Sequence, residues 1–220
     1  MVELQIIEKI MDTTADRTDR TGIVLAGGKS LRLGIDKSFI EINGRTLIES
    51  VVAKLAECVG DLIVVVDGVR KKEDVERVLK DYNISIVVDT IKDFGPIAGI
   101  YEGLKHAKSE YCGIFATDLP FLSKDLVDFL FRACIGFDAA IAVWSEKYSE
   151  PLHAVYRKDP MYRACEYSIN IKSKKVFSCV KLLKDVNYIP IGLIKKIDPE
   201  LKSFFNLNTR EDIDLINQQR

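Results

Sequence analysis

The sequence predicts an α/β fold in which helices flank a mostly parallel sheet. Short apolar runs, most of them rich in valine and isoleucine, alternate with segments of helical periodicity. The runs are apolar nearly throughout, which is typical of strands buried on both faces. Their repeated alternation with helices favours parallel pairing. Strands are expected at residues 22–26, 62–66, 84–88, 111–117 and 139–144, with a weaker one at 152–156.

Helical patterns separate these runs and continue to the end of the chain. Ser123 is a suitable N-cap for one of them. We see no internal repeat and no low-complexity linker, so we expect a single domain over residues 21–220. Helices are expected at residues 46–58, 71–80, 97–107, 124–133, 160–167, 174–183 and 209–218.

Residues 1–20 are expected to form an N-terminal extension to this domain. Leu4, Ile7 and Met11 recur at helical spacing and predict a short amphipathic helix. The stretch 12–20 is polar, and we expect it to be mobile. Acidic residues interrupt any apolar core of a secretion signal in this region.

The composition argues for a cytoplasmic protein and against several other classes. A formal net charge of −1 gives no general positive field for nucleic acid. No apolar run approaches the roughly 20 residues of a membrane span. The five cysteines are scattered, without a CxxC pair or a Cys/His cluster, so we expect reduced thiols and no zinc site.

The loop after the first expected strand predicts a phosphate site. It reads LAGGKSLRLGIDK over residues 25–37, with a glycine pair followed by Lys29, Arg32 and Lys37. Glycine lets successive backbone N–H groups face an anion, and the basic side chains add full charge. A P-loop is excluded because its first glycine would have to fall at Ile23. The dinucleotide fingerprint G-x-G-x-x-G does not fit either.

Aspartates follow three of the expected strands, namely Asp67, Asp89 and Asp118. In open parallel sheets, ligands bind outside the carboxyl ends of the strands, so these positions should face one site. Asp118 lies two residues before Pro120 and suits Mg²⁺, which is held through one or two carboxylates plus substrate phosphates.

These motifs resemble those of molybdenum cofactor guanylyltransferases. LAGGKSLRLGIDK is similar to the family signature, with Leu33 in place of methionine, and GPIAGI over residues 95–100 is similar to its GPLAG segment. TDLPF resembles the family's CDxPF element, with Thr117 in place of cysteine. PLHAVY resembles PLxAxY and NLNT resembles the closing N-x-N-T element. Glu150 stands where the family often has glutamine or histidine. The resemblance spans residues 22–216.

The resemblance implies a fold of the nucleotide-diphospho-sugar-transferase type, which is Rossmann-like, and an Mg²⁺-dependent transfer of GMP from GTP to a molybdopterin-type cofactor. Arg32 and Lys37 would hold the triphosphate, and Asp118 would be the Mg²⁺ ligand. The implied nucleotide-binding residues are Leu25, Ala26, Gly27, Gly28, Lys37, Asp67, Asp89 and Asp118.

The implied chemistry needs no strong general base. A phosphate monoester with a second pKa of about 6 is largely a dianion at neutral pH, and we see no Ser/His/Asp or Cys/His constellation. His153 is therefore interpreted as structural. Other molybdenum cofactor biosynthesis proteins are possible partners of such an enzyme.

Three alternatives remain open at the level of the sequence. They are a cytidylyltransferase for the same acceptor, a nucleotidyltransferase for a sugar phosphate or another cofactor, and a nucleotide-sensing or cofactor-delivery module without turnover. The presence of Arg32, Lys37 and Asp118 counts against the last of these.

Overall fold

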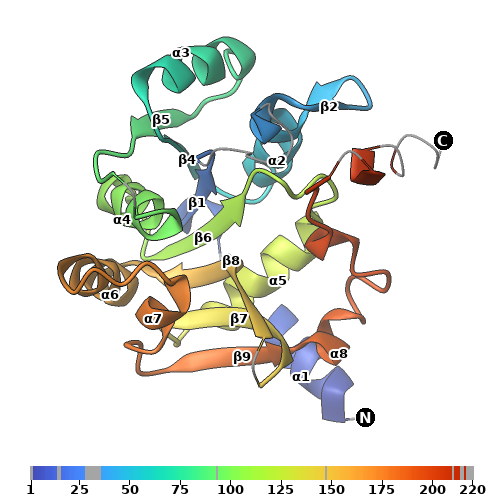
Figure 1. Ribbon diagram of the computed structural model, residues 1–220. Coiled ribbons are helices and arrows are strands. Elements are labelled where there is room, and N and C mark those ends of the chain that lie inside the picture. The colour runs from blue at the N-terminus through green and yellow to red at the C-terminus, as the bar shows by residue number, and fades with distance from the viewer. Residues whose placement is uncertain are drawn as a thin grey trace.

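The computed structural model of the protein describes residues 2–13, 16–27, 36–92, 94–146, 148–209, 211–213 and 216. It contains a seven-stranded sheet with helices on both faces (Figure 1), which confirms the predicted α/β fold. The strand order is β5-β4-β1-β6-β8-β7-β9. All neighbours are parallel except those of β8, which runs antiparallel to β6 and β7. The strands are β1 (Arg20–Leu25), β4 (Asp61–Val66), β5 (Ser85–Val88), β6 (Tyr111–Ala116), β7 (Ala139–Ser145), β8 (Tyr148–Arg157) and β9 (Val186–Pro190).

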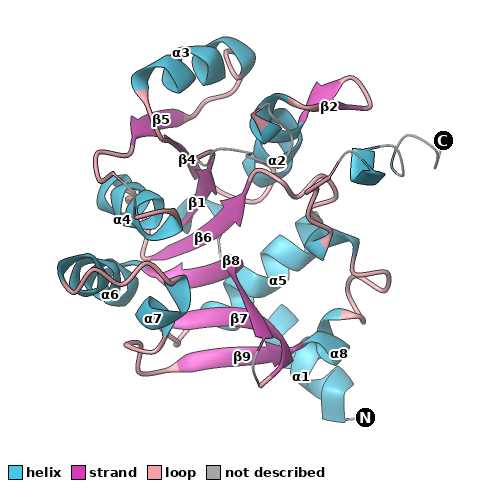
Figure 2. Ribbon diagram, in the orientation of Figure 1, coloured by secondary structure: helices cyan, strands magenta, loops and turns pink. Residues whose placement is uncertain are grey.

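The helices form a layer on each face of the sheet. Figure 2 shows α4, α6 and α7 along one face, and α2, α5 and α8 along the other. Helix α3 packs beside β4 and β5. None of the described helices has the length and apolar character that crossing a bilayer requires. The α-helices are α1 (Val2–Met11), α2 (Leu47–Ala56), α3 (Val69–Val78), α4 (Pro96–His106), α5 (Lys124–Cys134), α6 (Lys158–Asn170), α7 (Val176–Val180) and α8 (Ile191–Ile194); the 3-10 turns are η1 (Arg17–Asp19), η2 (Lys37–Phe39) and η3 (Lys202–Phe204).

The central strands bury both of their faces, which explains their continuous apolar sequence. In β1, Ile23 and Leu25 join the core under α4 and α6. Val24, between them, joins the core under α2 and α5. All three side chains are at most 9% exposed. A strand covered on both sides leaves no polar face, so its sequence shows no alternation.

Local signals fix where several helices begin. Ser123 caps α5 as predicted, because its Oγ accepts from the Leu126 N–H at 3.5 Å. Thr46 and Glu49 form a capping box at the start of α2. Pro96 lies in the first turn of α4, where its missing N–H costs nothing.

The structure adds elements that the sequence analysis did not predict. A short hairpin joins β2 (Glu41–Ile42) to β3 (Arg45–Thr46) through Asn43 and Gly44. Edge strand β9 and helix α8 were also missed, and α7 is shorter than its predicted range. Of the final predicted helix, residues 209, 211–213 and 216 are described; residue 209 is a bend, and the others are helical.

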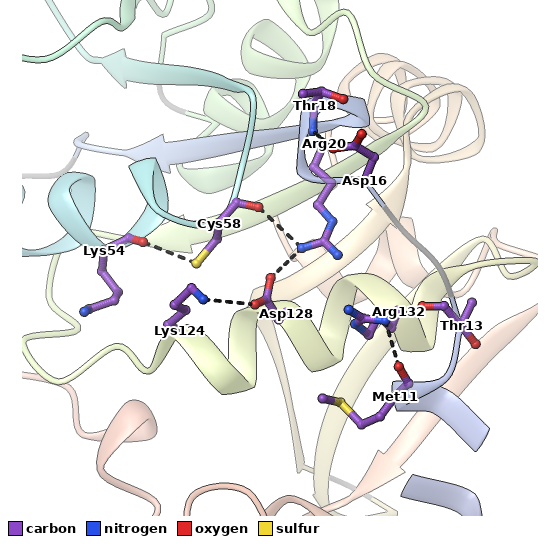
Figure 3. Close-up of polar contacts among 10 residues, drawn as sticks. All are labelled: Met11, Thr13, Asp16, Thr18, Arg20, Lys54, Cys58, Lys124, Asp128 and Arg132. Atoms are coloured by element: carbon purple, nitrogen blue, oxygen red, sulfur yellow. Dashed lines mark hydrogen bonds and ion pairs between the residues drawn. The ribbon is translucent and has the colours of Figure 1, made fainter. Parts of the chain in front are cut away.

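The N-terminal segment lies against the domain on helix α5 and then leads into β1. Helix α1 packs on α5, with Ile7 and Ile10 against the core. Arg132 of α5 donates a 2.7 Å hydrogen bond to the Met11 carbonyl and a second, short one to that of Thr13 (Figure 3). Arg20, assigned to the extension, is the first residue of β1. That residues 12–20 are mobile stays a prediction.

Candidate active site

A pocket of about 510 Å³ lies at the carboxyl edge of the sheet, over the ends of β4, β1 and β6. Residues from eight separate stretches of the chain line it, so only the folded chain assembles it. The lining residues are Leu25, Gly27, Asp36, Lys37, Ser38, Val65, Val66, Asp67, Asp89, Gly95, Pro96, Gly99, Ala116, Thr117, Asp118, Leu152 and Asn208.

The register of the parallel strands brings Asp67 and Asp89 to this pocket together. Val66, the last residue of β4, pairs with Val88, the last residue of β5. The ladder continues one step further, because the Asp89 N–H donates to the Val66 carbonyl at 2.7 Å. The two aspartates therefore leave neighbouring strands at the same level.

The GPIAGI segment shapes the wall of the pocket on the α4 side. Gly95 has a φ of 58°, a left-handed value that a residue with a Cβ adopts at a cost. Gly99, one turn into α4, allows a close approach to β1, since a Cβ there would stand 3.1 Å from Leu25 Cδ2. The first turn of α4 thus reaches the pocket over the end of β1.

Lys37 and Asp118 lie next to each other in the lining of the pocket. The Lys37 Nζ lies 3.6 Å from Asp118 Oδ2 and donates a 2.7 Å hydrogen bond to Asn208 Oδ1. The two charged side chains are 21% and 23% exposed. This places one cation and one carboxylate side by side, both open to a ligand.

Burial makes two of the four aspartates that line the pocket costly to ionise. Burial raises the pKa of Asp118 above its ordinary value, and the Lys37 ammonium offsets part of this effect. Burial also raises the pKa of Asp89, although the Ile91 N–H donates to its Oδ1 at 2.8 Å. A cation bound beside Asp118 would stabilise the charged form of that carboxyl group.

The C-terminal segment closes the pocket beside Asp118. The Leu207 N–H donates to the Asp118 carbonyl at 3.0 Å, which holds Asn208 near Lys37. Asp212 Oδ2 in turn accepts from the Asn208 and Thr209 N–H groups, at 2.7 Å each. The Asn208 N–H is the main reason why the pKa of Asp212 lies below its ordinary value.

Comparison with known proteins identifies the family of this chain. The family model described as "MobA-like NTP transferase domain" matches residues 22–179, more than half of the chain. The chain belongs to this family. A Methanosarcina acetivorans protein named "Probable molybdenum cofactor guanylyltransferase" is 38% identical over 89% of this chain and 88% of its own length. A Syntrophotalea carbinolica protein named "Molybdenum cofactor guanylyltransferase" is 30% identical over 90% and 91%.

A solved structure supports the same membership. The crystal structure of molybdopterin-guanine dinucleotide biosynthesis protein A from Archaeoglobus fulgidus matches with a TM-score of 0.76 and 29% identity. The match covers 90% of this chain and 97% of that one. Membership of the MobA-like family confirms the resemblance found in the motifs and identifies the protein as a nucleotidyltransferase.

Most of the residues singled out in the sequence meet in the MobA-like pocket. Those that line it are Leu25, Gly27, Lys37, Asp67, Asp89 and Asp118. Ala26 does not line it: its side chain is fully buried, and its N–H donates to the Val65 carbonyl at 2.8 Å. Gly28 and Arg32 lie outside the described residues. The roles assigned to all of these residues stay predictions.

The structure also brings in residues that the sequence analysis did not assign to the site. Asn208 belongs to the predicted NLNT motif, but its contact with Lys37 spans 171 positions and no local pattern reveals it. Asp36 directly precedes Lys37 and could have been suspected from that position alone. Leu152, from the start of the PLHAVY motif, adds an apolar side chain to the pocket wall.

Proposed function

We propose that this protein transfers GMP from GTP to the terminal phosphate of a molybdopterin-type cofactor, which yields a guanine dinucleotide form and pyrophosphate. The main support for the proposal is that the Lys37 ammonium and the Asp118 carboxylate lie 3.6 Å apart in a pocket of about 510 Å³. The chain around them is closely related to proteins named guanylyltransferases.

The donor occupies the pocket with its triphosphate against Lys37 in this proposal. Lys37 is the described cation of the signature loop that faces the pocket, and Arg32 of the same loop adds a second charge. Backbone groups at Leu25–Gly28 contact the base and ribose, together with Asp67 and Asp89. The pocket can take a nucleotide, because its volume falls in the usual range for small-molecule sites.

The reaction brings together two anions, the acceptor phosphate and the triphosphate, and expels a third, pyrophosphate. An oxygen of the acceptor phosphate bonds to the α-phosphorus, and the bond from that phosphorus to the pyrophosphate oxygen breaks. The acceptor is already largely a dianion at neutral pH, so no side chain has to remove a proton. Lys37 acts by offsetting the charge on the triphosphate and by holding it in line.

Asp118 fits the role of a Mg²⁺ ligand. Burial raises the pKa of its carboxyl, so a divalent cation beside it would relieve an unfavourable charge. Among the described residues, no three acidic, histidine or cysteine side chains converge on one point. That agrees with Mg²⁺, which takes one or two carboxylates and completes its shell with phosphates and water. When bound, Mg²⁺ would supply charge stabilisation at the phosphates.

Incubation with each of the four NTPs, Mg²⁺ and a molybdopterin-type cofactor tests the proposal, with the products identified by mass. We expect a product only with GTP, heavier than the acceptor by one GMP residue, and one pyrophosphate per product. A product with CTP alone would move the donor assignment to a cytidylyltransferase. Nucleotide binding without any pyrophosphate release would indicate a module that lacks turnover.

A further inference from the structure

An ion pair connects the end of the signature loop to Lys71 of helix α3, a residue outside the predicted motifs. The Nζ of Lys71, in the first turn of α3, lies 2.6 Å from Asp36 Oδ2. Asp36 directly precedes Lys37 and lines the nucleotide pocket. Lys71 does not line the pocket, so it would act on a nucleotide only through Asp36.

The surroundings of this pair set it apart from an ordinary surface ion pair. The Lys71 side chain is only 10% exposed and that of Asp36 is 33% exposed. Exposed pairs contribute little because water screens them and the side chains lose entropy. The neighbouring Lys72 shows the contrast, since its pair with Glu76 within α3 is longer, at 3.7 Å, and 37% and 53% exposed.

Asp36 uses its two carboxylate oxygens for two different tasks. Its Oδ1 accepts from the Ser38 N–H at 3.0 Å and so caps the 3-10 turn η2, whose first residue is Lys37. Its Oδ2 takes the Lys71 ammonium. The orientation of the turn that presents Lys37 therefore depends on where Lys71 holds the Asp36 carboxylate.

Helix α3 is well placed to serve as the fixed end of this connection. It begins directly after Asp67 and Gly68, at the carboxyl end of β4, and packs on β4 and β5. The ion pair thus connects the segment after β4 to the end of the signature loop, through two residues that are 35 positions apart in the chain.

We propose that Lys71 is a positioning residue for nucleotide binding, which acts through Asp36 to fix Lys37. The inference rests on the proposed function only in taking Lys37 as a ligand of the triphosphate. It predicts that loss of Lys71 weakens nucleotide binding while Lys37 is present and has little effect once Lys37 is gone.

A double-mutant cycle with calorimetric titration tests this coupling. Each NTP is first titrated into the wild-type protein, and the cycle uses the one that binds best. Lys71→Met should raise its Kd about tenfold, the scale of one lost charge-assisted hydrogen bond. Lys71→Arg should restore binding to within about twofold, and the control Lys72→Met should bind as the wild type does. In a Lys37→Ala background, Lys71→Met should raise Kd by less than about twofold.

Two results would overturn the inference. One is a Lys71→Met protein that binds the nucleotide normally, and the other is an undiminished effect of Lys71→Met without Lys37. If Lys71→Met does not fold, Asp36→Asn breaks the same pair from the other side and should give the same loss. If a nucleotide other than GTP binds best, the proposed donor is wrong while the cycle still decides the role of Lys71. Absence of binding by all four NTPs would overturn both.

Discussion

The two edges of the sheet each contain a pair of a cation and an aspartate, but the two pairs are built differently. At the carboxyl edge, Lys37 and Asp118 stand 3.6 Å apart and both are more than a fifth exposed. At the amino edge, Arg20 and Asp128 are 2.5 Å apart, and the arginine is only 4% exposed.

At the amino edge, neighbouring groups of the protein itself contact both members of the ion pair. Arg20 also donates to the Cys58 carbonyl at 3.4 Å, and Lys124 approaches Asp128 at 3.8 Å (Figure 3). The guanidinium of Arg20 lies over the ring of Phe131. The pair at the carboxyl edge instead lines a pocket. The same chemistry thus serves the fold at one edge and, in our proposal, a ligand at the other.

The largest expected effect is on turnover at the carboxyl edge. Asp118→Asn and Lys37→Ala should each lower the rate of pyrophosphate release by roughly 10²-fold or more, the scale of a lost electrostatic stabiliser. The melting temperature of Asp118→Asn should stay unchanged or rise. Burial raises the pKa of Asp118, so its charge at neutral pH opposes folding. A large loss of stability in Asp118→Asn would show that the pair at the carboxyl edge also stabilises the fold.

The next effect is on stability at the amino edge. Asp128→Asn leaves the Arg20 charge in a buried position and should cost about 3 kcal/mol of the free energy of unfolding. For a chain of this size that corresponds to a fall of roughly 6–12 °C in Tm. Thermal melts measure this loss, and turnover per folded protein should stay near the wild-type value. If Asp128→Asn had a normal Tm but had lost turnover, the pair at the amino edge would serve catalysis and not stability.

A pH effect is expected at His153, between the two edges. Its side chain is 2% exposed, packs on Phe204 and Phe115, and has no hydrogen-bond partner for either ring nitrogen. Burial lowers its pKa to about 3. Between pH 6.5 and 3 the unfolded chain therefore takes up a proton that the folded chain refuses, so stability falls as pH falls.

His153→Leu should remove this slope, which is at most about 1.4 kcal/mol per pH unit for one proton. Urea unfolding at several pH values between 7 and 4 measures it. His106→Gln is the matched control, because His106 is exposed beside Glu102. Parallel stability curves for His153→Leu and the wild type would contradict the assignment.

The smallest effect is expected from deleting residues 1–13. The pocket-lining residues begin at Leu25, so nucleotide transfer should be nearly unchanged. Loss of the contacts of Ile7 and Ile10 with the core should cost roughly 1–2 kcal/mol of stability. The deletion stops before Arg20 because that residue belongs to β1. A large loss of turnover with a preserved fold would show that the extension reaches the site.

The central strands could be predicted well because strands buried on both faces have consecutive apolar residues. It missed the β2–β3 hairpin, although Asn43-Gly44 is a strong turn signal, because strands of two residues show no periodicity. The antiparallel direction of β8 could not be predicted from the sequence either. Ala154, Val155 and Tyr156 are all fully buried, so the strand does not alternate as a one-sided antiparallel strand would.

In the site, prediction succeeded where a residue follows a strand and failed where two distant segments meet. Asp67, Asp89 and Asp118 could be placed at one edge because parallel strands end together. The contacts of Lys37 with Asn208 and of Asp36 with Lys71 depend on packing between elements far apart in the chain. Sequence spacing carries no information about such contacts.

The transfer of label from GTP labelled at its α-phosphorus shows directly whether the active site lies at the carboxyl edge of the sheet. The wild type, Asp118→Asn and Asp128→Asn are compared with Mg²⁺ and a molybdopterin-type acceptor, each at a temperature where melts show it folded. We predict that the label enters the dinucleotide product with the wild type and Asp128→Asn, and that Asp118→Asn transfers at most about a hundredth as much. Equal transfer by Asp118→Asn and the wild type would contradict the assignment of the active site to the carboxyl edge.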